Sequence, residues 1–202
     1  MKSFAYINRL FLTAILFVAS LPVCANSKYP LSLGIAGGYS NFNYSSGEIY
    51  LKSDFNGILN RKLEMKIGIN HRTYQLDLNH VSGIEIRSFS LFSDITVFPF
   101  NNGIFTGVRY QLLNTASLPE SSEIKIRDTG YYENMNLQTG TGLYFQGGYQ
   151  YHISDKFNVR LLGQPGVQYF TVHRMLSLST SLPIENHYQF VFDIMLGFEM
   201  KF

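Results

Sequence analysis

The end of the chain, residues 186–202, alternates strictly between apolar and other side chains, a pattern that few folds can accommodate. The apolar positions are Tyr188, Phe190, Phe192, Ile194, Leu196, Phe198, Met200 and Phe202. A period of two is that of a β-strand, because successive side chains of a strand point to opposite faces. The stretch therefore predicts a long strand with an apolar even-numbered face, and it puts Asp193 and Glu199 on the other face.

Residues 1–25 have the features of a secretory signal peptide. Lys2 and Arg9 supply positive charge around a short apolar run at residues 10–21, which is too short for a comfortable transmembrane helix. Small residues before Asn26 predict cleavage at that point. The remaining chain has the length of a single domain.

The one cysteine, Cys24, lies in this segment, and lipoprotein processing at Cys24 is the alternative to its removal. After removal, residues 26–202 would have no thiol, no disulfide and no cysteine ligand for a metal. Lys2 and Arg9 account for the formal net charge of +2, so the mature chain is neutral. A neutral chain gives no indication of a nucleic-acid partner.

Seven earlier segments alternate in the same way, which gives eight predicted strands. The earlier segments span residues 31–44, 49–59, 63–78, 84–97, 104–112, 137–153 and 157–170. Pro165 and Gly166 are expected to bend or bulge the last of these, because proline cannot donate to the ladder. The parity of the apolar residues changes after Thr73 and again before Phe89. Either this hairpin projects beyond a bilayer, or a pair of β-bulges shifts its faces.

The connections between these segments differ in length on the two sides. Those at 60–62, 99–103 and 154–156 are short, whereas those at 79–83, 114–136 and 171–185 on the other side are longer, with 45–47 a short exception among them. Outer-membrane barrels have short periplasmic turns and longer outer loops. Loop length was not used to find the strands, so it supports a membrane barrel independently.

The whole mature chain resembles the small eight-stranded outer-membrane barrels of the OmpA/OmpX-like class. The resemblance implies an all-β fold, an eight-stranded antiparallel up-and-down transmembrane β-barrel in the bacterial outer membrane. With no Trp, the 14 Tyr and 17 Phe would form its interfacial girdles. The resemblance also implies that the barrel-assembly machinery reads the last strand, with Leu196, Phe198 and Phe202 as the assembly signal.

The inward face of the predicted barrel collects charges of both signs. They are Lys52, Asp54, Glu64, Lys66, Arg72, Asp94, Arg109, Arg160, Asp193 and Glu199. An eight-stranded barrel is just wide enough to be filled by side chains, and charges sealed inside it must pair. We therefore expect a filled, salt-bridged interior, with a narrow polar pore or proton path as the alternative.

The barrel class hosts adhesins, anchors, lipid-modifying enzymes and pores, so the resemblance selects no activity. We expect a structural or surface-interaction role through the outer loops, in contact with outer-membrane lipid and a possible surface ligand. The loop residues that we expect to make such contacts are Glu120, Lys125, Arg127, Tyr131 and Tyr132.

Two other functions remain open from the sequence. His80 and Ser82 are similar to the His-x-Ser pair of PagL-type lipid A deacylases, with Asp94 as an acid, although a turn with a polar tip is the favoured explanation. A soluble lipocalin-like barrel would instead have apolar residues inside and polar ones outside. The five His residues show no metal-ligand spacing, so we expect no metal and no cofactor.

Overall fold

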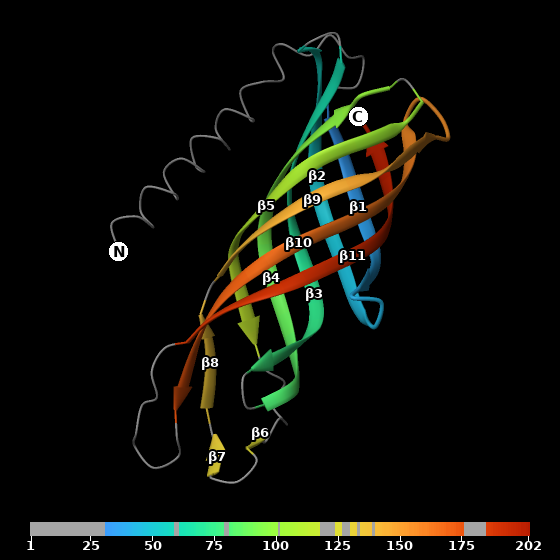
Figure 1. Cartoon of the computed structure of the whole chain (residues 1–202). Coiled ribbons are helices and arrows are strands. Elements are labelled where there is room, and N and C mark those ends of the chain that lie inside the picture. Colours follow the sequence, from blue (N-terminus) through green and yellow to red (C-terminus); the bar gives the residue numbers. More distant parts are fainter. Residues whose placement is uncertain are drawn as a thin grey trace.

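Eight long strands pair in chain order, and the last pairs with the first, so the sheet closes into a barrel (Figure 1). The computed structural model describes residues 31–58, 61–78, 81–100, 102–117, 124–126, 130–132, 134–138, 140–175 and 185–202. The barrel strands are β1 (Leu31–Ser40), β2 (Tyr44–Ile58), β3 (Arg61–Leu78), β4 (Val81–Phe98), β5 (Ile104–Ser117), β9 (Gly140–His152), β10 (Phe157–Met175) and β11 (Glu185–Lys201). The expected signal peptide lies outside the described residues. Within them, no helix has the length and hydropathy to cross a membrane.

The closing seam joins β1 to β11 in one unbroken antiparallel register, from Ser32 opposite Lys201 to Ser40 opposite Asp193. The two backbones approach closely at Gly38. A Cβ at this position would lie 1.9 Å from the carbonyl oxygen of Ile194, so only glycine fits without a backbone shift. The barrel thus closes where the alternating last strand, β11, packs closely against Gly38 of the first strand, β1.

The two ends of the barrel differ. One end, the C-terminal rim, carries Phe202 and the turns that precede β5 and β10; the amide of Lys201 donates to the carbonyl of Lys156 there at 2.8 Å. The opposite end, the loop rim, carries the β1–β2 turn. Beyond the loop rim lie β6 (Ile124–Ile126), β7 (Gly130–Tyr132) and β8 (Asn134–Gln138) (Figure 1). β6 pairs with β7, and β8 extends the pairing of β9 along β10.

The first turn lies earlier than the sequence predicted. It occupies residues 41–43, whereas residues 45–47 belong to β2, with Gly47 paired to Gly37. Asn41 and Phe42 adopt left-handed backbone angles, with φ of 48° and 64°. Asparagine tolerates this conformation, and the Asn41 side chain also accepts a hydrogen bond of 2.8 Å from the amide of Phe192. Ser and Gly at 45–47 resemble a turn by composition but are accommodated in the strand.

Of the two explanations for the parity changes, the pair of β-bulges is absent from this part of the β3–β4 pair. The register runs unbroken from Lys62 opposite Phe98 to Leu76 opposite Ile84. Ile86 consequently points inward, where it is fully buried. In this part of β4 the apolar side chains point inward instead of outward, while the strand keeps its regular alternation of inward and outward positions.

Two residues depart from the simple alternation that was expected. Pro165 keeps its register opposite Phe192, so β10 has no bulge there, but the pairing of β9 with β10 is interrupted at residues 164 and 165 and resumes at Gly166 in the same register. Leu112, expected on the outer face, is only 4% exposed. It lies at register shifts of β5 against both neighbours, where a bulge disturbs the alternation of the faces.

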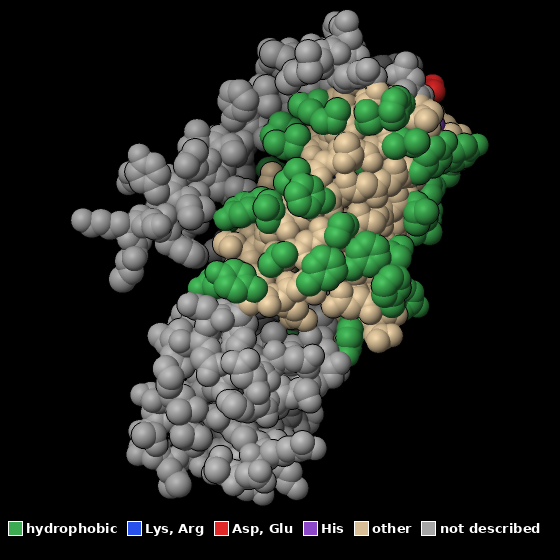
Figure 2. Space-filling model, viewed as in Figure 1, with side chains coloured by type: hydrophobic (Ala, Val, Ile, Leu, Met, Phe, Trp, Pro, Cys, Tyr) green, Lys and Arg blue, Asp and Glu red, His purple; other side chains and the backbone are tan. Residues whose placement is uncertain are grey.

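The outer wall of the barrel is apolar. Along β11, Phe190, Leu196, Phe198 and Phe202 are between 47% and 64% exposed, whereas Asp193 and Glu199 between them are buried. Figure 2 shows hydrophobic side chains spread over the wall, with charged side chains nearly absent from that face. Exposed aromatic side chains stand towards the loop rim (Tyr39, Phe42, Tyr188, Phe190) and towards the C-terminal rim (Phe100, Tyr149, Tyr151, Phe157, Phe202).

Candidate functional site

The candidate site is the interior of the barrel, where the structure brings together all ten charged residues that the sequence placed there. Lys52, Asp54, Glu64, Lys66, Arg72, Asp94, Arg109, Arg160, Asp193 and Glu199 are each at most 7% exposed. They occupy inward positions of six strands, since even-numbered residues of β2, β3, β4 and β10 and odd-numbered residues of β5 and β11 point to the axis. Ionised groups buried to this degree are stable only with partners.

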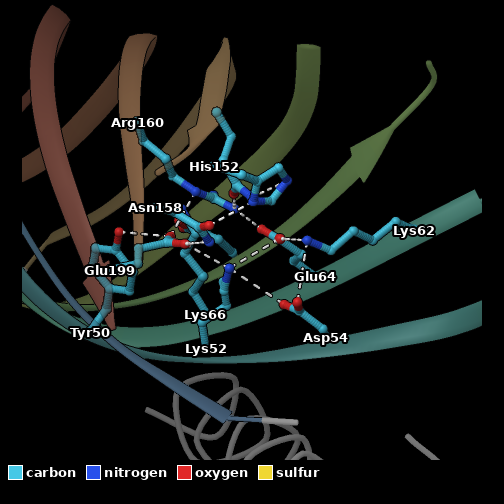
Figure 3. A network of polar contacts seen from close by, with 12 residues as sticks. Tyr50, Lys52, Asp54, Lys62, Glu64, Lys66, His152, Asn158, Arg160 and Glu199 are labelled. Carbon is cyan, nitrogen blue, oxygen red and sulfur yellow. Dashed lines mark hydrogen bonds and ion pairs between the residues drawn. The ribbon is translucent and has the colours of Figure 1, made fainter. Parts of the chain in front are cut away.

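Four of these charged residues form the centre of a network in the half of the barrel nearer the C-terminal rim (Figure 3). The Lys52 ammonium lies 2.7 Å from a Glu199 oxygen and 3.1 Å from a Glu64 oxygen. The Arg160 guanidinium bridges the same two carboxylates, with its Nε 2.7 Å from Glu199 and an Nη2 contact to Glu64. Each cation therefore contacts both acids, and each acid contacts both cations. We call Lys52, Glu64, Arg160 and Glu199 the central quartet.

Three further side chains complete the partners of the quartet. Lys62 is 2.7 Å from Glu64 and 3.2 Å from Asp54, and its side chain is 27% exposed, which places it at the mouth of the barrel. The Tyr50 hydroxyl donates to Glu199 at 2.9 Å, and the Asn158 amide donates to the same carboxylate at 3.2 Å. Charge-assisted hydrogen bonds of this kind fix the orientation of the acid as well as stabilising its charge.

A second group of ion pairs lies in the half of the barrel nearer the loop rim. Arg109 donates two bonds to Asp94, at 2.7 and 2.8 Å, and a third to Glu48 at 2.6 Å. Arg72 pairs with Asp193 and donates to the Tyr144 hydroxyl at 2.7 Å. The two groups are connected through Lys66, whose ammonium is 4.0 Å from Asp94 and 4.8 Å from the ring centre of Tyr50.

Apolar and aromatic side chains fill the space around the charges. Phe98, Phe105, Leu162 and Met195 form a buried cluster, and the Arg160 guanidinium lies over the Phe105 ring at 4.9 Å. Arg109 lies 3.7 Å from the ring centre of Phe92. Planar guanidinium groups stack well on aromatic rings, so these contacts pack the interior and stabilise its charges together.

Sequence reasoning missed several residues of this interior. Glu48 was overlooked because the second strand was expected to begin at residue 49, and Lys62 was assigned to a turn. Extending the alternation of Ile49 and Leu51 by one residue would have placed Glu48 inside. The inward aromatics carry no comparable signal, because in an alternating strand a buried Phe looks like a lipid-facing one.

With Glu48 and Lys62 included, the paired charges of the described interior are six of each sign, and Lys201 at the C-terminal rim is a further inward cation near Lys62 and Asp54. Six carboxylates (Glu48, Asp54, Glu64, Asp94, Asp193, Glu199) face six cations (Lys52, Lys62, Lys66, Arg72, Arg109, Arg160). Every one of them is within 4.0 Å of an opposite charge. The paired charges can hold a rigid plug, because each ionised group has a partner of opposite sign.

A row of polar side chains crosses the inner wall beside this plug. On one side Thr96 is paired with Gly107, which is paired with Gln146; on the other, Gln164 is paired with Asp193, which is paired with Ser40. The pairing of β9 with β10 joins the two parts of the row. Each of the five polar side chains has at least one buried oxygen or nitrogen without a hydrogen-bond partner among the described residues. Buried polar atoms of this kind bind internal water. These atoms are therefore suited to bind single internal waters.

The structure separates the residues of the possible catalytic triad. Asp94 lies twelve positions after Ser82 on the same strand, β4, which at about 3.3 Å per residue puts them about 40 Å apart. Asp94 is also bound to Arg109 by two hydrogen bonds. It cannot serve as the acid for a His80–Ser82 pair; His80 itself lies outside the described residues.

The other residues singled out from the sequence fall at the two rims. Leu196, Phe198 and Phe202 lie on the outward face of β11. Lys125 and Tyr131 are register partners in the β6–β7 hairpin, which also contains Tyr132. Glu120 and Arg127 lie outside the described residues. Within the described part of the chain, no group of His, Cys, Asp and Glu could hold a metal ion.

A closed barrel with an apolar outer wall and a polar, filled interior reverses the usual arrangement of a soluble protein. The fold is that of an eight-stranded outer-membrane β-barrel. No protein-family model matches the sequence, and no curated protein matches it either.

Two solved structures of outer-membrane proteins are similar to this chain. One is a major outer membrane protein from Thermus thermophilus, with 15% identity, a TM-score of 0.47, and coverage of 87% of this chain and 100% of that chain. The other is OprG from Pseudomonas aeruginosa, with 11% identity, a TM-score of 0.46, and coverage of 87% and 99%. At such low identity and TM-score, neither likeness bears on activity.

Proposed function

We propose that the chain is an integral protein of the bacterial outer membrane, with a non-conducting barrel that serves as a rigid anchor for surface loops. The observation that carries the proposal is the inversion of polarity, with apolar side chains outside and paired charges inside. A lipocalin-like barrel would have the reverse arrangement, so the burial pattern argues against that alternative. Lipid is the solvent in which such an outer wall is stable.

The height of the apolar wall fits a bilayer. On β3 the outward positions are apolar from Leu63 to Ile69, and they become polar at His71 and Thr73. A membrane-crossing strand needs about 9–11 residues. The apolar outward run of β3 covers seven residues, and that of β11, from Phe190 to Met200, covers eleven. The C-terminal rim would then lie at the periplasmic surface and the loop rim at the cell surface, where short turns and longer loops respectively are typical.

The expected partners follow from this orientation. Lipid contacts the wall, and the barrel-assembly machinery would bind the outward face of β11 at Leu196, Phe198 and Phe202 during insertion. The β5–β9 and β10–β11 connections would extend from the cell, and the β6–β7 hairpin, in which Lys125 and Tyr131 are register partners, would contact a surface ligand. Loops held by a rigid scaffold are where such proteins carry recognition.

Fractionation of a Gram-negative host that expresses the full chain tests the proposal. We expect the protein in the outer-membrane fraction, extractable only with detergent, and migrating faster on a gel before boiling than after it. A compact barrel that resists detergent causes that difference in migration. Recovery in the soluble periplasmic fraction, without a change in migration on boiling, would refute the proposal.

A further inference from the structure

An apolar groove crosses the outer wall of β1–β4, where two glycines face each other. Gly37 of β1 lies opposite Gly47 of β2, and Gly47 lies opposite His71 of β3. Because neither glycine has a side chain, the wall is lower here than around it. The groove has a volume of about 670 Å³, and exposed apolar side chains such as Leu33, Ile35, Ile49, Leu51, Ile69 and Phe89 line it.

A polar cavity of about 520 Å³ adjoins the groove on the side of the loop rim. Its lining residues are Asn43, Tyr44, Ser45, His71, Thr73 and Arg87. His71 lines both the cavity and the groove, and its ring packs on Phe89 with centroids 4.6 Å apart. The Ser45 and Thr73 hydroxyls are 3.5 Å apart, and Thr73 lies directly opposite Arg87.

The charge of this cavity favours an anion. Arg87 brings an exposed guanidinium, and His71 adds the nitrogens of its imidazole ring. Tyr44, Ser45 and Thr73 line the same cavity and add hydroxyl groups. A planar guanidinium with hydroxyl donors beside it matches the oxygens of a phosphate group.

The order of the two sites along the strands matches the order of the parts of a lipid. The apolar groove lies at the level of residues 67–69 of β3, and the polar cavity begins at His71 and includes Thr73. This is the level at which the outward face of β3 changes from apolar to polar. A headgroup in the cavity would therefore stand at the interface, with its acyl chain directed down the groove.

We propose that the cavity and the groove together bind one phosphorylated lipid of the outer leaflet, with the phosphate at Arg87 and an acyl chain lying in the groove over Gly47. This inference rests on the proposed outer-membrane location. It goes beyond general contact with lipid, because it requires both a phosphate and a specific strip of wall. Ordinary boundary lipid would show no preference for either.

Titration of the purified, folded protein in non-ionic detergent with diphosphoryl lipid A, followed by native mass spectrometry, tests the proposal. The wild type is expected to retain one lipid A molecule in preference to zwitterionic phosphatidylcholine, and inorganic phosphate should not displace it. Equal retention of the two lipids would mean boundary contact alone, and displacement by inorganic phosphate would mean a simple anion site. Either result overturns the proposal.

Two variants probe the two halves of the site. Arg87→Gln is expected to weaken lipid A binding about tenfold or more, since a charge-assisted hydrogen bond is lost. Gly47→Val should weaken binding by filling the groove; a Cβ at Gly47 would meet its nearest atom, the carbonyl oxygen of Ala36, at an ordinary 3.7 Å, so the barrel should fold. Lys156→Gln removes the same charge at the exposed turn of the opposite rim and should leave binding unchanged.

The outcome is separable from that of the proposed function. Gel migration before and after boiling reports whether each variant forms the barrel, whatever it binds. Wild-type protein that forms the barrel but binds lipid A no better than Arg87→Gln does would refute the lipid site alone and leave the membrane location standing.

Discussion

Replacement of Glu64 by leucine is expected to destabilise the folded barrel by about 3–5 kcal/mol, because it leaves buried cations without their shared acid. Glu64 contacts Lys52 at 3.1 Å, Lys62 at 2.7 Å and also Arg160. The remaining acids of the network, Asp54 and Glu199, cannot neutralise all three. A loss of this size is a large part of the usual stability of a protein, about 5–15 kcal/mol.

The measurement is urea unfolding in lipid vesicles, with the folded fraction read from gel migration without boiling, since the chain has no Trp for fluorescence. Asp155→Leu is the matched control, because it removes a carboxylate from an exposed turn at the same end of the barrel. It should change stability by no more than about 0.5 kcal/mol. Equal effects of the two replacements would contradict the view that the network stabilises the interior.

Arg109→Ala should cost a similar amount, about 3–5 kcal/mol, for the opposite reason. It leaves two buried carboxylates, Asp94 and Glu48, without the guanidinium that binds both at 2.6–2.8 Å. It also removes the group stacked on Phe92. The same unfolding measurement applies, and we expect part of the Arg109→Ala protein to fail to fold at all.

Neutralising the partners separates charge from packing in this prediction. Arg109→Met keeps most of the volume, and adding Asp94→Asn with Glu48→Gln removes the unpaired negative charges. We expect the triple variant to recover at least half of the stability that Arg109→Met alone loses, as replacement of a complete buried ion group often does. A triple variant less stable than Arg109→Met alone would show that the carboxylates are stabilised by something other than Arg109.

The alternation of side chains was sufficient to predict the barrel. The last strand alone distinguished the outward residues, such as Phe198, from the inward ones, such as Glu199. A period of two survives in the sequence because lipid requires one face to be apolar at every position that crosses the bilayer. Where lipid no longer imposes this, as at Ile86, the pattern inverted. Of the two explanations that the sequence left open, the unbroken β3–β4 register excludes the pair of bulges and is compatible with a hairpin that projects beyond the bilayer.

Turn positions and ion-pair partners could not be predicted in the same way. The first turn was misplaced because Ser45–Gly47 has the composition of a turn, whereas the actual turn depends on left-handed Asn41 and Phe42. The partners of Arg109 come from β2 and β4, and those of Arg160 from β3 and β11. Such pairs depend on the tilt of the strands and the closure of the barrel, which no local pattern encodes.

The ion conductance of the purified wild-type protein in planar lipid bilayers tests the filled interior most directly. With the folded state of the same preparation verified by gel migration, we predict a baseline current without discrete open-channel steps, because paired charges and the Phe98–Phe105 cluster occupy the barrel axis. Reproducible single-channel steps from the folded wild type would contradict a plugged barrel and establish a pore in its place.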